Sequence, residues 1–382
     1  MSTLSRRTLL AGLVGGSALA AGSGVLLHHL WQSLNAHEGI YVNFVGPQGY
    51  KGNFRPDLED KFKMVIWNIH TGALEEIPVP FHVHSVVFSP KTSTFLGIQK
   101  WRDQMFSLDW KSRKINKVLK NTKHRQFIGH GVMHPEHKQI YVSEGLFPRT
   151  TVNYAEGKIT LRDIHTLKWI EEFPSHGENP HDIRLLQRGE VLVVCNQGTI
   201  NQRPETRSNI AFIQRRTGKL LTKIQAPSLQ QNFAHMDLLS DTEVLAVTKS
   251  RQKSSNNFIV KASVNGKMEL FDNGNLKGKT VDEILSVAVD QKRRIVAATN
   301  PKGQRVLFWD INTRKLIKSI NTFEKPLGIS MTKDGRFYIV SDIRQGTALL
   351  NADTLQLENH FLPKNLQQRH FTLAHSTMLT AS

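Results

Sequence analysis

Four histidines occupy related positions in the sequence. They open the segments HSVVF, HGVMH, HDIRL and HMDLL, and each segment leads into a strand-like run. Neutral imidazoles that converge are typical ligands of copper, iron or zinc, and such a group can also bind an anion. The candidate ligands are His84, His130, His181 and His235. In the alternative interpretation, each imidazole only joins its own segment to the next by hydrogen bonds.

The four histidines belong to a repeat of roughly 40 to 50 residues. The clearest copy, residues 84–120, has four short apolar stretches separated by turn residues. Period-two alternation with turn signals about every 8 to 12 residues predicts antiparallel β-structure. Five further copies follow, and Asp109, Asp163 and Asp310 mark a similar turn in three of the six.

A seventh copy is split between the two ends of the chain. GIYVNFVG and KMVIWNIHTGALEEIPVP supply three strands near the N-terminus, and the C-terminal HFTLAHSTMLTA supplies the missing first strand. A sheet completed by both ends closes a ring and protects its edges. We therefore predict an all-β fold, a single seven-bladed β-propeller over residues 37–382 that is closed by N- and C-terminal strands and preceded by a signal or anchor segment, residues 1–36.

Repeat symmetry places the four histidines in an arc at one mouth of the central channel. Leu285 and Leu327 stand at the equivalent position of the next two copies, so the arc covers half the ring. The ends of second strands should lie near the same mouth. They contribute the supporting residues Glu144, Asn196 and Asp342. The carboxylates of Glu144 and Asp342 are candidates either for ligands or for partners that orient the histidines. The alternative is that such residues satisfy backbone donors in turns.

The N-terminus has the organisation of an export signal. Arg6 and Arg7 in SRRTLL match the twin-arginine pattern, and an apolar, glycine-rich run follows from Ala11 to Leu27. We therefore expect export to the periplasm by the twin-arginine route. No cleavage site is obvious, so the segment is also a candidate tether to the inner membrane.

The charge and cysteine content narrow the class of partner. A net charge of +18 would ordinarily suggest nucleic acid, but an exported protein does not meet it; an anionic membrane surface or an acidic partner fits better. The single cysteine, Cys195, excludes a disulfide framework, and its apolar surroundings in EVLVVCNQG indicate a buried strand residue. We expect a monomer.

Several segments together resemble one bacterial family. The twin-arginine start, RQFIGHGVMHPEHKQIYVSEG, GENPHDIRLL, VVCNQG and FAHMDLL are similar to the family called domain of unknown function 1513. The resemblance implies an exported propeller without an established activity, often encoded beside imelysin-like iron-uptake proteins. It therefore implies a role in handling iron or another metal, with metal-uptake proteins as partners.

The expected function is that of a periplasmic binding protein holding a metal ion or complex, iron or copper, at the histidine arc. Gly-x-Ser-x-Gly, a Walker-type loop and His-Glu-x-x-His are absent from the sequence, so an enzyme is the less favoured class. A propeller lactonase or a quinoprotein-like oxidoreductase remains one alternative, although histidine is softer than calcium prefers. A protein-interaction scaffold without ligand is the other.

Overall fold

The structure, a computed structural model, describes residues 40–45, 62–68, 72–122, 124–147, 156–199, 206–250, 257–276, 283–358 and 377–379. The predicted signal segment, residues 1–36 with Arg6 and Arg7, lies outside these ranges. Within them, no helix is long and apolar enough to span a membrane.

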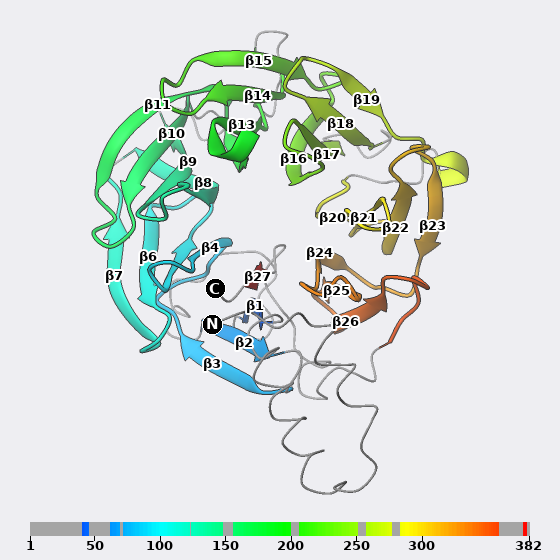
Figure 1. The fold of residues 1–382 in the computed structure, drawn as a ribbon, viewed down its shortest axis with the longest axis horizontal. Helices are drawn as coiled ribbons and strands as arrows, with labels where there is room; N and C mark the ends of the chain where they lie inside the picture. The colour runs from blue at the N-terminus through cyan, green and yellow to red at the C-terminus, as the bar shows by residue number, and fades with distance from the viewer. Residues whose placement is uncertain are drawn as a thin grey trace, which may run out of the picture.

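The chain forms an all-β propeller, in which small antiparallel sheets follow one another around a ring (Figure 1). Short 3-10 turns, η2 (Gln187–Gly189) and η4 (Gly274–Leu276), interrupt the strands. The first three complete sheets in chain order are β4 (Ser85–Ser89), β5 (Thr94–Ile98), β6 (Gln104–Asp109) and β7 (Lys114–Lys120); β8 (Arg125–Met133), β9 (Gln139–Leu146), β10 (Glu156–Asp163) and β11 (Trp169–Glu178); and β12 (Pro180–Leu186), β13 (Val191–Asn196), β14 (Asn209–Gln214) and β15 (Leu220–Gln225).

The remaining strands continue around the ring. They are β16 (Gln231–Leu238), β17 (Glu243–Ser250), β18 (Ile259–Ser263) and β19 (Met268–Leu270); β20 (Val287–Asp290), β21 (Ile295–Asn300), β22 (Arg305–Asp310) and β23 (Leu316–Ile320); β24 (Pro326–Met331), β25 (Phe337–Asp342) and β26 (Gly346–Asn351); and the closing sheet of β1 (Ile40–Val45), β2 (Lys63–Asn68), β3 (Leu74–Pro78) and β27 (Thr377–Leu379).

Both ends of the chain contribute to one sheet, as the split repeat predicts. β27 pairs antiparallel with β1, with Tyr41 opposite Met378, and β1 continues into β2 and β3. The innermost strands contact one another in the order β27, β4, β8, β12, β16, β20, β24 and back to β27. The sheets therefore close on themselves around the centre seen in Figure 1.

The prediction of seven blades is met only in part. Six sheets are complete four-stranded blades, and the described part of the remaining sheet, β24–β26, has three strands. Leu357, in the segment expected to form its fourth strand, makes only an isolated bridge to Leu350. Apolar spacing in the sequence cannot distinguish such a bridge from a full ladder, because both leave a leucine facing the neighbouring strand.

The repeated aspartates are turn residues between the third and fourth strands of their sheets. The carboxylates of Asp109, Asp163 and Asp310 accept hydrogen bonds from the amides three residues later at 2.6, 2.7 and 2.6 Å. The next residue has a positive φ in each case, for example +59° at Arg113. This side-chain cap lets the chain reverse direction without glycine, which explains why the same spacing recurs in the sequence.

The hydrophobic core lies between neighbouring sheets rather than within one. Phe212 of β14, for example, shares a buried cluster with Phe233 of β16 and Val260 of β18. Cys195 of β13 belongs to the same cluster and is fully buried, as predicted, and burial raises the pKa of its thiol well above the usual value. Since each sheet buries its faces only against the next, stacking fixes the position of every inner strand.

Candidate metal centre

The four candidate histidines lie on the inner strands of four successive sheets. His84 immediately precedes β4, while His130, His181 and His235 lie within β8, β12 and β16. The last three occupy irregularities in strand pairing: the register shifts between Phe127 and Gly131 in β8, between Pro180 and Asp182 in β12, and between Phe233 and Met236 in β16. A bulge turns a side chain out of the ordinary alternation. His130, His181 and His235 are therefore presented at bulges, whereas His84 stands at the start of its strand.

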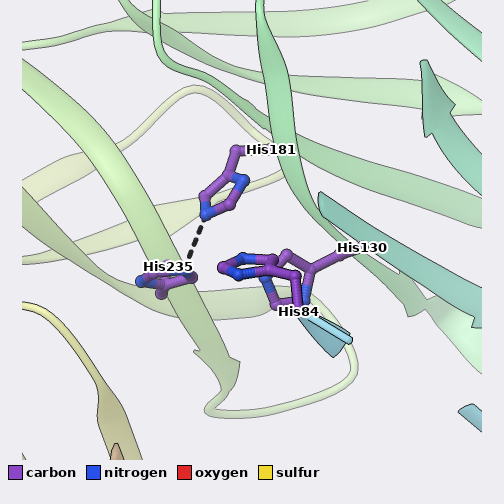
Figure 2. Close-up of side chains that lie close together, drawn as sticks. All are labelled: His84, His130, His181 and His235. Carbon is purple, nitrogen blue, oxygen red and sulfur yellow. Dashed lines mark hydrogen bonds between the residues drawn. The ribbon is translucent and has the colours of Figure 1, made fainter. Parts of the chain in front are cut away.

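The four imidazoles converge on one volume (Figure 2). One ring nitrogen of each lies within 4.8 Å of a ring nitrogen of every other. The closest rings are those of His181 and His235, with centroids 4.6 Å apart, and His130 lies 4.8 Å from His181. His130, His181 and His235 are buried, and His84 is half-buried. The predicted gathering of these four residues is confirmed; the metal-ligand role is a further step.

Hydrogen bonds to the backbone fix the tautomers of two of the rings. Nδ1 of His181 lies 2.8 Å from the carbonyl oxygen of Ile128, and Nδ1 of His235 lies 2.6 Å from that of Leu285. A carbonyl only accepts, so each Nδ1 donates, and in the neutral imidazole Nε2 then carries a lone pair. Each bond also ties its histidine to a neighbouring sheet. The structural role and the ligand role thus use different nitrogens of the same ring.

The two lone pairs face each other across a short gap. Nε2 of His181 and Nε2 of His235 are 2.7 Å apart. Two unprotonated nitrogens repel at this distance unless a proton or another cation lies between them. Burial, and after it the charge of Lys100 and the neighbouring imidazoles, lowers the pKa of His181 well below its usual value of 6.5. The lowered pKa favours the neutral imidazole, the form that binds metal.

Lys100, just after β5, places its amino group beside the cluster. Its Nζ lies 3.3 Å from Nε2 of His181. Burial lowers the pKa of Lys100 to about 7, with a further lowering by Lys249 that Glu283 opposes. The amino group is therefore held next to the same lone pair that faces His235.

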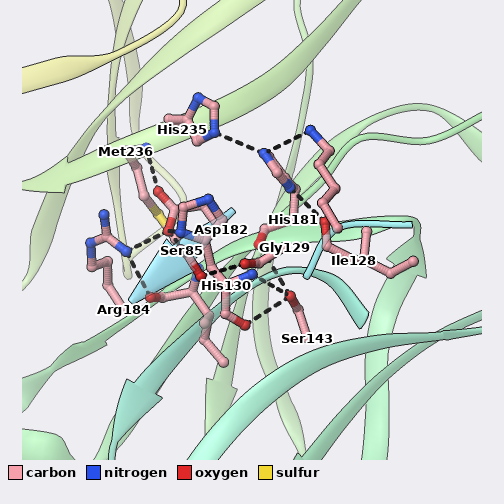
Figure 3. A network of polar contacts seen from close by, with 12 residues as sticks. Ser85, Ile128, Gly129, His130, Ser143, His181, Asp182, Arg184, His235 and Met236 are labelled. Atoms are coloured by element: carbon pink, nitrogen blue, oxygen red, sulfur yellow. Dashed lines mark hydrogen bonds and ion pairs between the residues drawn. The ribbon is translucent and has the colours of Figure 1, made fainter. Parts of the chain in front are cut away.

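Small residues pack around the rings (Figure 3). A Cβ on Gly129 would lie 2.5 Å from Nδ1 of His181 and 3.1 Å from Cδ2 of His84, and its φ of +150° is one that other residues rarely adopt. The hydroxyl of Ser85 donates to the Gly129 carbonyl. The hydroxyl of Ser143 donates to the carbonyls of His130 and His181 at 3.0 and 3.1 Å. These contacts hold the backbone from which the imidazoles project.

The carboxylate of Asp182 lies beside the cluster. Its Oδ1 lies 3.6 Å from Nδ1 of His130 and accepts hydrogen bonds from the guanidinium of Arg184 and, at 2.9 Å, from the amide of Ile183. Its Oδ2 accepts from the amide of Met236 at 2.9 Å. Burial raises the pKa of Asp182, and Arg184 and the two amides oppose the rise. Asp182 thus connects β12 to β16 and lies close to His130 (Figure 3).

The predicted supporting residues make their contacts outside the four-histidine group. Glu144 accepts hydrogen bonds from Arg162 at 2.8 Å and Arg125 at 3.0 Å. Asn196 binds Ser175 and Asn209, joining β11, β13 and β14. Asp342 accepts from four turn amides, those of Glu324, Lys325, Arg344 and Gln345. For Asp342 this is the turn role that the sequence left open.

Sequence reasoning missed Lys100, Gly129, Ser143 and Asp182. Lys100 follows a second strand, and Lys249 lies next to the last residue of another, so the repeat argument that singled out Glu144 could have found it. Gly129 precedes His130 in the sequence, and its role depends on a ring from another sheet. Ser143 and Asp182 are each adjacent to a residue that the sequence analysis did select.

The fold and the buried imidazoles define a β-propeller with a histidine cluster at the inner ends of four sheets. The family model described as "Protein of unknown function (DUF1513)" matches residues 77–372. The chain belongs to this family, as its motifs indicate. The match contains all four histidines, and no curated protein matches the chain.

Solved structures resemble the chain in fold alone. The hydrazine synthase of Kuenenia stuttgartiensis aligns with a TM-score of 0.59 at 12% identity, covering 77% of this chain and 90% of that one. Sqt1 of Saccharomyces cerevisiae aligns with a TM-score of 0.56 at 11% identity, covering 78% of each chain. At such identities the likeness supports the propeller architecture and carries no activity across.

Proposed function

We propose that this protein binds a first-row transition-metal ion at His84, His130, His181 and His235. The observation that supports it most directly is the 4.8 Å limit on the separations of the four ligand nitrogens. Metal–imidazole bonds of about 2.0 to 2.1 Å in a tetrahedral site place nitrogens about 3.3 Å apart. The 2.7 Å gap between His181 and His235 would open by about half an ångström, and the wider separations would shorten.

Copper is the ion we favour, and iron is second. Imidazole binds copper, zinc, iron and nickel, and among divalent ions affinity is highest for copper. Non-haem iron sites usually add a carboxylate, and the metal-binding group found among the described residues consists of imidazoles alone. The same composition disfavours calcium, which takes oxygen ligands.

The binding test compares metal content with matched histidine variants. Full-length protein is loaded with copper or iron, desalted and analysed for bound metal. The wild-type protein should retain one ion per chain, and the double variant His130→Ala plus His181→Ala should lose most of its bound metal. His165→Ala is the control, because His165 is exposed in the turn after β10. If the wild-type protein retains no stoichiometric metal while circular dichroism shows it folded, the proposal is wrong.

We also propose that the protein works in the periplasm, where it passes metal to an uptake partner. The support is in the sequence: the Arg6–Arg7 pair, the apolar run that follows, and the family resemblance. Changing both arginines to lysine should block export, because the twin-arginine route reads the pair itself. Fractionation of cells carrying wild-type or variant protein tests this. Equal periplasmic amounts of the two would refute the export proposal.

A further inference from the structure

The electrostatic surroundings of the cluster are unusual for a cation site. Lys100 lies 3.3 Å from Nε2 of His181, an atom that the proposed function assigns to the metal. The nearby carboxylates are already engaged: Asp182 binds Arg184, and Glu283 lies 2.6 Å from Nζ of Lys249. A divalent ion bound by four neutral imidazoles would thus add two positive charges beside the amino group of Lys100. In a buried volume, uncompensated charge is strongly unfavourable.

An anion that enters with the metal removes this difficulty. It would neutralise part of the added charge, and the Lys100 amino group could donate to it once the metal occupies the lone pair of His181. The position suits the task, because Lys100 follows β5, the strand that pairs with β4, and His84 just before β4 is the least buried of the four histidines. Charge-assisted hydrogen bonds of this kind are about twice as strong as neutral ones.

We propose that the centre binds its metal ion together with a small monovalent oxygen- or nitrogen-donor anion, such as a carboxylate, and that Lys100 is the residue that holds this anion. This inference rests on the proposed metal site and identifies the class of its cargo: a metal–anion complex rather than a bare ion. It assigns Lys100 to anion binding and leaves metal retention to the imidazoles.

The test uses copper-loaded full-length protein and azide or formate as probe anions. Azide bound to copper produces a charge-transfer absorption, and its titration gives a dissociation constant. Lys100→Met should keep stoichiometric copper and weaken azide and formate binding by about tenfold or more. Lys100→Arg should restore part of the affinity. Lys117→Met, on the exposed outer strand β7, is the matched control and should behave as the wild type does.

The outcomes separate this inference from the proposed function. If Lys100→Met retains copper and binds azide as tightly as the wild type, the Lys100 inference is wrong and the metal site stands. If Lys100→Met loses copper, Lys100 is itself a ligand and the inference is wrong in another way. If azide binds equally well without metal, the site is an anion site alone. A wild-type protein that binds no metal overturns both proposals.

Discussion

Replacing Gly129 by alanine tests the geometry of the cluster at its tightest point. The new Cβ would lie 2.5 Å from Nδ1 and 2.7 Å from Cε1 of His181, closer than real atoms approach. The ring cannot retreat without losing its 2.8 Å hydrogen bond to the carbonyl of Ile128. Loss of that bond in a buried setting costs about 1 to 2 kcal/mol, and the φ of +150° adds about 1 to 2 kcal/mol of backbone strain.

We therefore expect Gly129→Ala to lower the free energy of unfolding by about 2 to 4 kcal/mol. Gly335→Ala is the control: its φ is +69°, and nothing lies within 4 Å of the added Cβ, so it carries only the backbone term of about 1 kcal/mol. Denaturant unfolding measures both. In a His181→Ala background the collision is absent, and the extra cost of Gly129→Ala should fall toward that of the control.

Metal affinity is the second readout of the same variant. A displaced His181 should weaken copper binding by at least about tenfold, the equivalent of one 1.4 kcal/mol step, while Gly335→Ala leaves binding unchanged. Gly129→Ala that is no less stable than Gly335→Ala, and binds copper normally, would refute the placement of His181 against Gly129.

Three further results are expected. Glu144→Gln should destabilise the fold by about 3 kcal/mol or more in denaturant unfolding, because Arg162 loses its buried carboxylate partner, but should leave metal content unchanged; metal loss would place Glu144 at the site after all. Ser143→Ala should cost about 1 to 2 kcal/mol and weaken copper binding, since one hydroxyl bonds the carbonyls of His130 and His181; stability equal to the wild type would contradict that role. Side-chain hydrogen bonds from Lys261, the larger cause, and from Lys267 lower the pKa of Glu269 from 4.5 to about 2, so its stabilisation of at most about 1 kcal/mol is complete above pH 4.5 and lost as the pH falls through 2. The free energies of unfolding of Glu269→Gln and wild type should therefore differ at pH 6 and converge in acid. A difference that does not change with pH would exclude the ionic cause.

The sequence predicts the propeller and the histidine gathering because both follow from repetition. His84, His130, His181 and His235 stand at one repeat position, so any ring-forming arrangement of the copies brings them together. Ring closure was predictable for the same reason: the N-terminal strands lack a partner that the C-terminus supplies.

The parts that the sequence did not predict depend on pairing between strands. The register shift between Phe127 and Gly131 aims His130 inward, and a bulge leaves no distinct signal in apolar spacing. Glu144 faces Arg162 rather than the histidines, because the direction of a side chain is set by the register of its strand. The three-stranded sheet was missed because Leu357 has the apolar character of a strand residue while pairing only as a bridge.

X-ray absorption spectroscopy of the copper-loaded, full-length protein tests the central claim most directly, because imidazole ligands give a recognisable scattering pattern from the outer ring atoms. The account predicts four imidazole nitrogens at about 2.0 Å from a single ion, together with one oxygen or nitrogen donor from the anion, which exchanges for azide. A spectrum with one imidazole or none at the ion would contradict it.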